Sequence, residues 1–196
     1  MSVWLQILLG LLAGAFFGFF ALSSQIKSAE KNILKIWINL SDALDNRYLK
    51  LKNLLLFLKK YMTDFHGEID ELNSVIDKTL DVDKTLKMVP LKLALENEVN
   101  FKLENIKSNM EKYPSLYDDQ EINEAIIAVA ESESSVGDEI TLYNAVIFQF
   151  RILLESFPYS FSAWVLNKSP EGFSDFVVTS AEQLNENYIS EEDINI

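Results

Sequence analysis

Few side chains in this sequence could carry catalytic or metal chemistry. The chain has no cysteine and one histidine, His66, so thiolate chemistry and the paired Glu-x-x-His ligands of a di-iron helical bundle are excluded. Thr63, not Glu, stands three residues before His66. His66 also falls at an expected break between helices, which favours a turn or capping residue. Since no phosphate-binding or dinucleotide-binding glycine loop occurs either, we expect no catalytic residue, no cofactor and no enzymatic activity.

Clustered carboxylates are the remaining candidates for ion binding, because Ca²⁺ and Mg²⁺ prefer oxygen ligands. Asp81 and Asp83 form one cluster, and Asp118, Asp119 and Glu121 form another. Neither fits a calcium loop of the EF-hand kind. The second cluster is better explained as the cap and first turn of a helix, where negative charge is favourable. We therefore expect no metal site, and a carboxylate-based ion-binding or enzymatic helical bundle remains the alternative hypothesis.

Three of the six glycines, Gly10, Gly14 and Gly18, lie four residues apart near the N-terminus. Residues at this spacing share one helix face. In lipid, a groove of small residues lets two helix backbones approach closely, as in the GxxxG motif. The pattern therefore predicts self-association inside a membrane. The alternative is that glycine is simply frequent in membrane helices.

The glycines lie in a stretch from Val3 to Leu22 that contains no Asp, Glu, Lys or Arg. A helix of about 20 residues is about 30 Å long, which matches the hydrocarbon core of a bilayer. We therefore predict a transmembrane helix over residues 3–22, with the lipid bilayer as its partner. A cleaved signal peptide is the competing interpretation, because Ala21 and Ser23 provide a small-residue site. Against it, no Lys or Arg precedes the apolar run.

Apolar residues after Ser24 recur every three or four positions, which is the spacing of amphipathic helices. The pattern predicts long helices over residues 26–62, 68–80, 90–112 and 120–157. Pro90 suits the first turn of the third helix, and Pro158 ends the fourth. The apolar piece at 161–166 is expected to fold back over the open end of the bundle.

The predicted fold is therefore all-α. An N-terminal transmembrane helix leads into an antiparallel four-helix bundle with long helices, within residues 24–173. Apolar stripes facing one another would hold such a bundle together. Residues 183–196 are acidic and lack a periodic apolar face, so this tail is predicted to be disordered.

Three short blocks carry a further signal. The first, WINLSDALDNRYLKLKNLLLFLKKY, has Trp, Arg, Asn-Leu and Lys-x-Tyr in order; the second is MEKYPSL; the third, YNAVIFQFRILLESFP, has Tyr-Asn followed by Phe-Pro. Their order and spacing resemble the LemA family of bacterial membrane-anchored helical proteins. The residues that carry this resemblance are Trp37, Arg47, Asn53, Leu54, Lys59, Tyr61, Glu111, Tyr113, Pro114, Leu116, Tyr143, Asn144, Phe157 and Pro158.

The resemblance covers residues 26–173 and implies a helical bundle on a membrane anchor, with no established enzymatic activity. The sequence departs from the family where residues 49–52 read LKLK rather than DLIP, and where Phe150-Arg151 replaces a second Tyr-Asn. The chain thus resembles a divergent member, and a partner surface built from those positions need not be retained.

Four of the motif positions have an expected structural role. Asn53 and Asn144 each fall within a long helix beside apolar residues. We predict that both are buried and fix helix register by hydrogen bonding across helices, and the alternative is that they face solvent. Tyr113 and Phe157 precede prolines that end helices, so their rings are predicted to pack under the turns.

Charge bears on the partner and the membrane side. The net charge is −13, and residues from Tyr113 onward include 2 basic and 16 acidic side chains. An acidic half repels phosphate backbones, so we expect no nucleic acid but an unidentified, basic protein partner. Lys27, Lys31 and Lys35 follow the apolar stretch, and the positive-inside rule then puts the bundle on the cytoplasmic side of a bacterial inner membrane. The hypothesis is a single-pass membrane-anchored scaffold.

Overall fold

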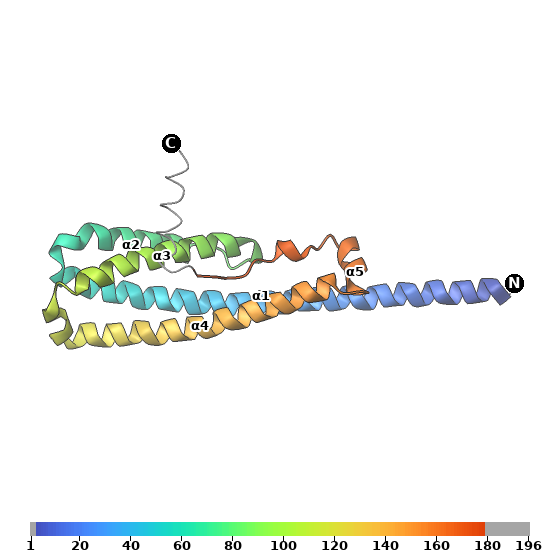
Figure 1. The fold of residues 1–196 in the computed structure, drawn as a ribbon, viewed down its shortest axis with the longest axis horizontal. Helices are drawn as coiled ribbons and strands as arrows, with labels where there is room; N and C mark the ends of the chain where they lie inside the picture. The colour runs from blue at the N-terminus through green and yellow to red at the C-terminus, as the bar shows by residue number, and fades with distance from the viewer. Residues whose placement is uncertain (1–2, 179–196) are drawn as a thin grey trace, which may run out of the picture. The chain divides into compact units, whose positions relative to one another are not determined.

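The computed structural model describes residues 3–178, and α-helices dominate these residues (Figure 1). The described part of the chain contains no β-strand, which confirms the all-α class. Its helices are α1 (Val3–Tyr61), α2 (His66–Leu80), α3 (Val89–Met110), α4 (Gln120–Glu155) and α5 (Tyr159–Val165), with short 3₁₀ turns between them. The predicted disordered tail, 183–196, lies outside the described residues.

The apolar stretch and the first amphipathic segment form one unbroken helix, α1. No proline interrupts it, and its glycines all lie within the apolar stretch. The helix ends at Tyr61, after Lys59 and Lys60, whose charges favour a helix C-terminus. His66 then opens α2, and its Nε2 hydrogen-bonds the carbonyl oxygen of Lys59 at 2.7 Å. His66 thus lies at the expected break between two helices, but it is the first residue of α2 rather than a turn residue.

Local capping explains where α3 and α4 begin. Pro90 occupies the first turn of α3, where its missing N–H has no partner to lose. One carboxylate oxygen of Asp119 accepts hydrogen bonds from the N–H groups of Glu121 (2.8 Å) and Ile122 (3.2 Å). Asp119 thus caps α4, as predicted. The helix ends at Glu155, slightly before the predicted end.

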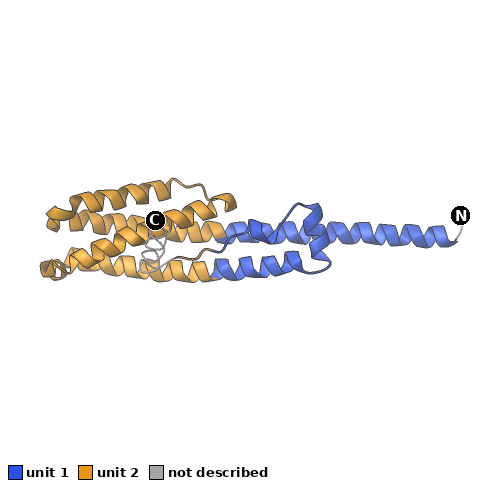
Figure 2. Ribbon diagram, turned by 45° about the horizontal axis from the view of Figure 1, so that its top comes forward, with its two compact units in different colours: residues 1–36, 142–175 blue, residues 37–141, 176–196 orange. Residues whose placement is uncertain are grey.

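The chain divides into two compact units, coloured separately in Figure 2. Unit 1 comprises residues 1–36 and 142–175, and unit 2 comprises residues 37–141 and 176–196. The helices α1 and α4 each contribute to both units. The antiparallel four-helix arrangement stays a prediction for the chain as a whole.

In unit 2, α2 and α3 lie side by side (Figures 1 and 2). Lys52 on α1 pairs with Asp77 on α2, and Lys59 pairs with Asp70, each with an N–O distance of 2.6 Å. Residues later in α1 pair with residues earlier in α2, so these two helices are antiparallel. The interior of unit 2 is apolar and includes Leu44, Leu51, Leu55, Leu58, Leu72, Ile76, Val99, Leu103, Ile106, Ile122 and Val129.

In unit 1, the segment after α5 is held against α4. The ring of Phe150 meets that of Phe173 edge-on, with centroids 4.9 Å apart. Arg151 donates to the carbonyl oxygen of Phe173 and pairs with Asp175 at 2.9 Å. Phe150 and Arg151, which replace the second Tyr-Asn of the family pattern, therefore anchor this segment. The helix α5 itself contacts α1, and its predicted role as a cap on the bundle stays a prediction.

Candidate functional site

A buried cluster of charged residues in unit 2 is the main concentration of polar chemistry among the described residues. It arises on α3, whose buried positions alternate by threes and fours, the heptad spacing of packed helices. Two of these positions hold charges, Lys92 and Glu96. The buried positions on α3 are Val89, Lys92, Glu96, Val99, Leu103, Ile106 and Met110.

Glu96 is shared between two side chains of α1. Arg47 Nη1 donates to one carboxylate oxygen of Glu96, and the Tyr48 hydroxyl donates to the other. Arg47 and Glu96 are only 4 % and 2 % exposed. Arg47 Nη2 also donates to Asn100 Oδ1 at 2.5 Å and lies 3.7 Å from a carboxylate oxygen of Glu133 on α4. Burial, followed by the charge of Glu96, raises the pKa of Tyr48 far above its usual value, so its hydroxyl stays protonated.

A second pair of charges lies beside the first. Lys92 is almost fully buried, and its Nζ donates to Asp45 Oδ1 and to the carbonyl oxygen of Thr79, both at 2.8 Å. Lys84 bridges Asp45 and Asp42, with N–O distances of 2.7 and 2.6 Å. Hydrogen bonds to Asp42 and then Asp45 raise the pKa of Lys84. Lys92, Asp45 and the Thr79 carbonyl, together with the Arg47–Glu96–Tyr48 group, form a buried polar network that joins α1, α2 and α3. Lys84 and Asp42 lie at its exposed edge.

The geometry of the buried polar network favours positioning over catalysis. Both carboxylate oxygens of Glu96 accept hydrogen bonds, one from Arg47 and one from the Tyr48 hydroxyl. Within residues 3–178, no group of three or more His, Cys, Asp or Glu residues is placed to hold a metal ion. Buried ion pairs cost desolvation and can define which residues face one another. The network is therefore suited to fix the register, that is, which residues of α1 and α3 face one another.

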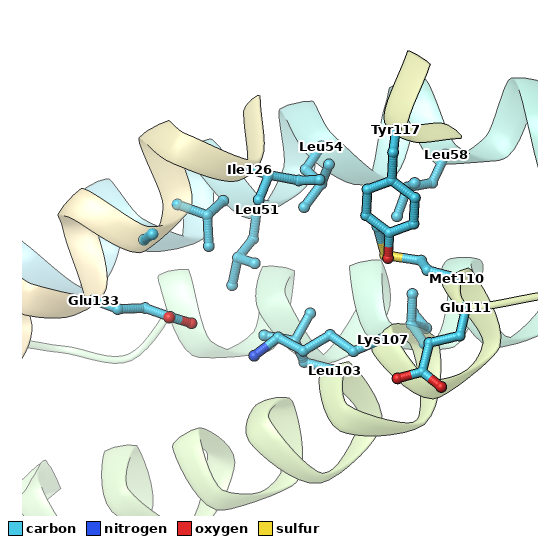
Figure 3. A pocket seen from close by; sticks show the side chains of 13 residues that line it. Leu51, Leu54, Leu58, Leu103, Lys107, Met110, Glu111, Tyr117, Ile126 and Glu133 are labelled. Atoms are coloured by element: carbon cyan, nitrogen blue, oxygen red, sulfur yellow. The ribbon is translucent and has the colours of Figure 1, made fainter. Parts of the chain in front are cut away.

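An apolar cleft of about 370 Å³ lies next to the network in unit 2 (Figure 3). Its walls come from α1, α3, α4 and the turn before α4. Leu51, Leu54 and Leu103 are among the apolar side chains on the walls, and Glu133 lies at one end. Since Glu133 also lies near Arg47, this end of the cleft adjoins the buried network. The volume falls in the range of small-ligand sites.

A comparison with models of known protein families identifies the family of the chain. The model of the LemA family matches residues 36–187. The chain belongs to the LemA family. No curated protein and no solved structure matches it. The matched region begins after the apolar stretch of α1 and contains the whole buried polar network, so the network belongs to the LemA region of the chain.

Several LemA motif residues are buried packing residues. Trp37 is buried with its ring 5.9 Å from that of Phe176, and Leu54 is buried on the wall of the cleft. Tyr143 is buried, and its hydroxyl donates to the carbonyl oxygen of Ser174 at 3.1 Å. The motif arginine, Arg47, is the centre of the buried polar network.

The motif positions at the turns have mixed roles. The Tyr61 hydroxyl donates to Asp119, the cap of α4. Pro114 opens a 3₁₀ turn, and the ring of Tyr113 meets that of Phe65 edge-on, with centroids 6.2 Å apart. The prediction that Tyr113 packs at its turn agrees with this contact.

Two predictions for LemA motif residues were wrong. Asn53 is exposed and cannot fix register from within the core. It lies two residues from both Leu51 and Leu55, so the helical rotation of about 100° per residue carries it to the far side. Phe157 precedes Pro158 but is 88 % exposed rather than packed under the turn. Asn144 is half-buried, and its register role stays a prediction.

The glycines of the apolar stretch lie open. Gly10, Gly14 and Gly18 are exposed, and a Cβ added to any of them would meet no atom within 4 Å. The face that they form is free to accept a second helix.

Lys92 and Glu96 were missed by the sequence analysis, although a signal was present. Both fall on the heptad positions between Val89 and Val99. Charged residues at such positions in an otherwise apolar stripe indicate a buried ion pair that needs a partner on the facing helix.

Proposed function

We propose that this LemA family protein is a single-pass membrane-anchored helical scaffold without catalytic activity. The observation that carries the proposal is the apolar N-terminal part of α1. The most apolar segment of this helix is not buried against the rest of the described chain. Its exposed large side chains are Val3, Trp4, Leu5, Ile7, Leu8, Leu9, Leu11, Leu12, Phe16, Phe17 and Phe20.

A helix that exposes so many large apolar side chains is unfavourable in water. Monomeric soluble proteins rarely expose contiguous apolar patches of more than a few hundred Å². A helix that is apolar all round needs an apolar surrounding on every side. A bilayer provides one, and the stretch from Val3 to Leu22 has the length to cross it.

The scaffold role rests on what the rest of the chain offers to a partner. The exposed carboxylates Glu121, Glu124, Glu131 and Asp138 line the part of α4 in unit 2. The part of α4 in unit 1 has an exposed apolar stripe instead, formed by Leu142, Phe148 and Ile152. The acidic surface of unit 2 fits a basic protein partner, and the apolar stripe of unit 1 offers a separate apolar contact.

Fractionation of broken cells tests the anchor. The full-length protein is expected in the membrane pellet and should resist carbonate extraction. Replacing both Leu8 and Leu12 by Lys should move it to the supernatant, because two charges at the bilayer centre cost several kcal/mol. The matched control, with Leu34 and Ile38 replaced by Lys, changes exposed residues of α1 outside the apolar stretch and should stay in the pellet. Full-length protein in the supernatant would overturn the proposal.

Self-association through the glycine face is part of the proposal. Gly14→Ile would fill the open face and keep two helix backbones apart. Crosslinking in membranes should yield oligomers for the parent chain and lose them for Gly14→Ile, whereas Leu12→Ile should retain them. Identical crosslinking patterns for all three proteins would contradict the glycine contact.

Orientation follows from the lysines after the apolar stretch. Lys27 and Lys35 are exposed and lie on the side of α1 that leads to the LemA region, which favours a cytoplasmic location for that region in the bacterial inner membrane. Alkaline phosphatase fused to the C-terminus should then be inactive. An active fusion would place the LemA region outside.

A further inference from the structure

The short helix α5 in unit 1 buries its small side chains and exposes its large apolar ones. Its buried residues are the small Ser162 and Ala163. Its large side chains point outward instead, since Phe161, Trp164 and Val165 are 58 %, 75 % and 48 % exposed. A helix stabilised by water would bury its large apolar face.

This outward face adjoins the apolar part of α1. The rings of Phe161 and Phe19 have centroids 6.3 Å apart, and the Tyr159 hydroxyl donates to Gln25 Oε1 at 2.5 Å. Phe19 and Gln25 are about 9 Å apart along the helix axis and bracket Leu22, the end of the charge-free stretch. The helix α5 therefore lies at the level where α1 would leave the hydrocarbon.

Charges in unit 1 lie on the other side of this level. Lys168 follows α5 and pairs with Glu30 on α1, with an N–O distance of 2.6 Å. Glu30 lies about 12 Å beyond Leu22 along the helix. The aromatic side chains of α5 thus adjoin the apolar end of the emerging α1, whereas the ion pair adjoins its polar continuation.

We propose that α5 is an interfacial helix, whose Phe161, Trp164 and Val165 insert into the headgroup boundary of the leaflet from which α1 emerges. The proposal rests on the membrane anchor proposed above. Tryptophan and other aromatic side chains favour this boundary, and helices with one apolar face bind there in the plane of the membrane. Ser162 and Ala163 let α5 lie close to the rest of unit 1.

The absence of cysteine makes site-directed spin labelling a clean test. Single-cysteine variants Leu12→Cys, Val165→Cys and Asn32→Cys of the full chain are labelled and reconstituted in phosphatidylcholine vesicles. Leu12 reports on the anchor, Val165 on α5, and the exposed Asn32 on a part of α1 about 15 Å beyond Leu22. The measured quantity is the ratio of collisional accessibility to oxygen over that to a water-soluble nickel complex.

Insertion predicts a high ratio at Leu12, a low one at Asn32, and a value at Val165 several-fold above that at Asn32. Adding Trp164→Ser to the Val165→Cys variant should lower the ratio at Val165. The same change should leave the thermal unfolding in detergent unchanged, which separates lipid contact from a structural role. A Val165 label as water-accessible as the Asn32 label, with Leu12 in hydrocarbon, would refute the interfacial helix and leave the anchor standing. A water-accessible Leu12 label would refute both.

Discussion

Removing Glu96 alone should reveal how strongly the LemA region depends on its buried polar network. Glu96→Leu keeps the size of the side chain but deletes the carboxylate that accepts from both Arg47 and Tyr48. Arg47 would keep Asn100 at 2.5 Å and Glu133 at 3.7 Å as partners. Its guanidinium would nevertheless lose its closest counter-charge in a site where it is only 4 % exposed.

The expected cost is about 3–5 kcal/mol, the range measured when one member of a buried ion pair is removed. Globular domains are stable by about 5–15 kcal/mol, so the variant would lose a large share of its free energy of unfolding. An exposed pair sets the scale for comparison. Asp77 and Lys52 lie 2.6 Å apart but are more than one-third exposed, and Asp77→Leu should cost about 0–1 kcal/mol.

Urea unfolding of the full chain in detergent micelles, followed by far-ultraviolet circular dichroism, measures these differences. The double variant Arg47→Leu/Glu96→Leu adds a decisive comparison, since removing both charges leaves no unpaired buried ion. It should be more stable than the sum of the two single changes predicts.

Two results would refute the reasoning. A loss for Glu96→Leu no larger than that for Asp77→Leu would mean that water reaches Arg47 in solution. A double variant whose loss equals the sum of the single losses would mean that Arg47 and Glu96 are not energetically coupled.

Four further outcomes are expected. Tyr48 and Tyr143, whose pKa values burial raises well above 10.0, should not ionise in an absorbance titration until the protein unfolds, and the stability they confer should fall as the pH rises past 10.0. The hydrogen bond from Tyr61, followed by those from backbone N–H groups, lowers the pKa of Asp119 below 3.8. The stability that Asp119 confers should therefore be present above pH 3.8 and disappear as the pH falls through the lowered pKa. Asp119→Asn should remove this acid dependence of the melting temperature. Asn144→Leu should change helix pairing or oligomeric state, and an unchanged melting temperature and size in gel filtration would dismiss its register role. Leu51→Asp should abolish the cooperative unfolding transition, because it buries an unpaired charge.

Helix existence could be predicted from the sequence because apolar periodicity and capping chemistry act locally. Pro90 and Asp119 marked the starts of α3 and α4 from their immediate neighbours. The apolar periodicity after Ser24 predicted a buried stripe on the first amphipathic helix, and Leu44 and Leu51 of α1 are buried.

The buried polar network could not be derived in the same way. The burial of Glu96 depends on Arg47, 49 residues earlier in the chain, and local patterns contain no information about that pairing. The error at Asn53 has a different origin. Apolar neighbours in the sequence suggested burial, but helical periodicity puts Asn53 on the face opposite Leu51 and Leu55.

Buried charges are costly, but they can fix the register between packed helices. Leucine and isoleucine stripes at heptad spacing fit one another again after a slip of one heptad, about 10 Å along the axis. Apolar burial alone therefore discriminates weakly between registers of α1 and α3. After such a slip, Glu96 would lie about 10 Å from Arg47 and Tyr48, and each charge would be buried without its partner. The native register is the one in which Glu96 meets Arg47 while Lys92 meets Asp45, so the two ion pairs together penalise displacement in either direction.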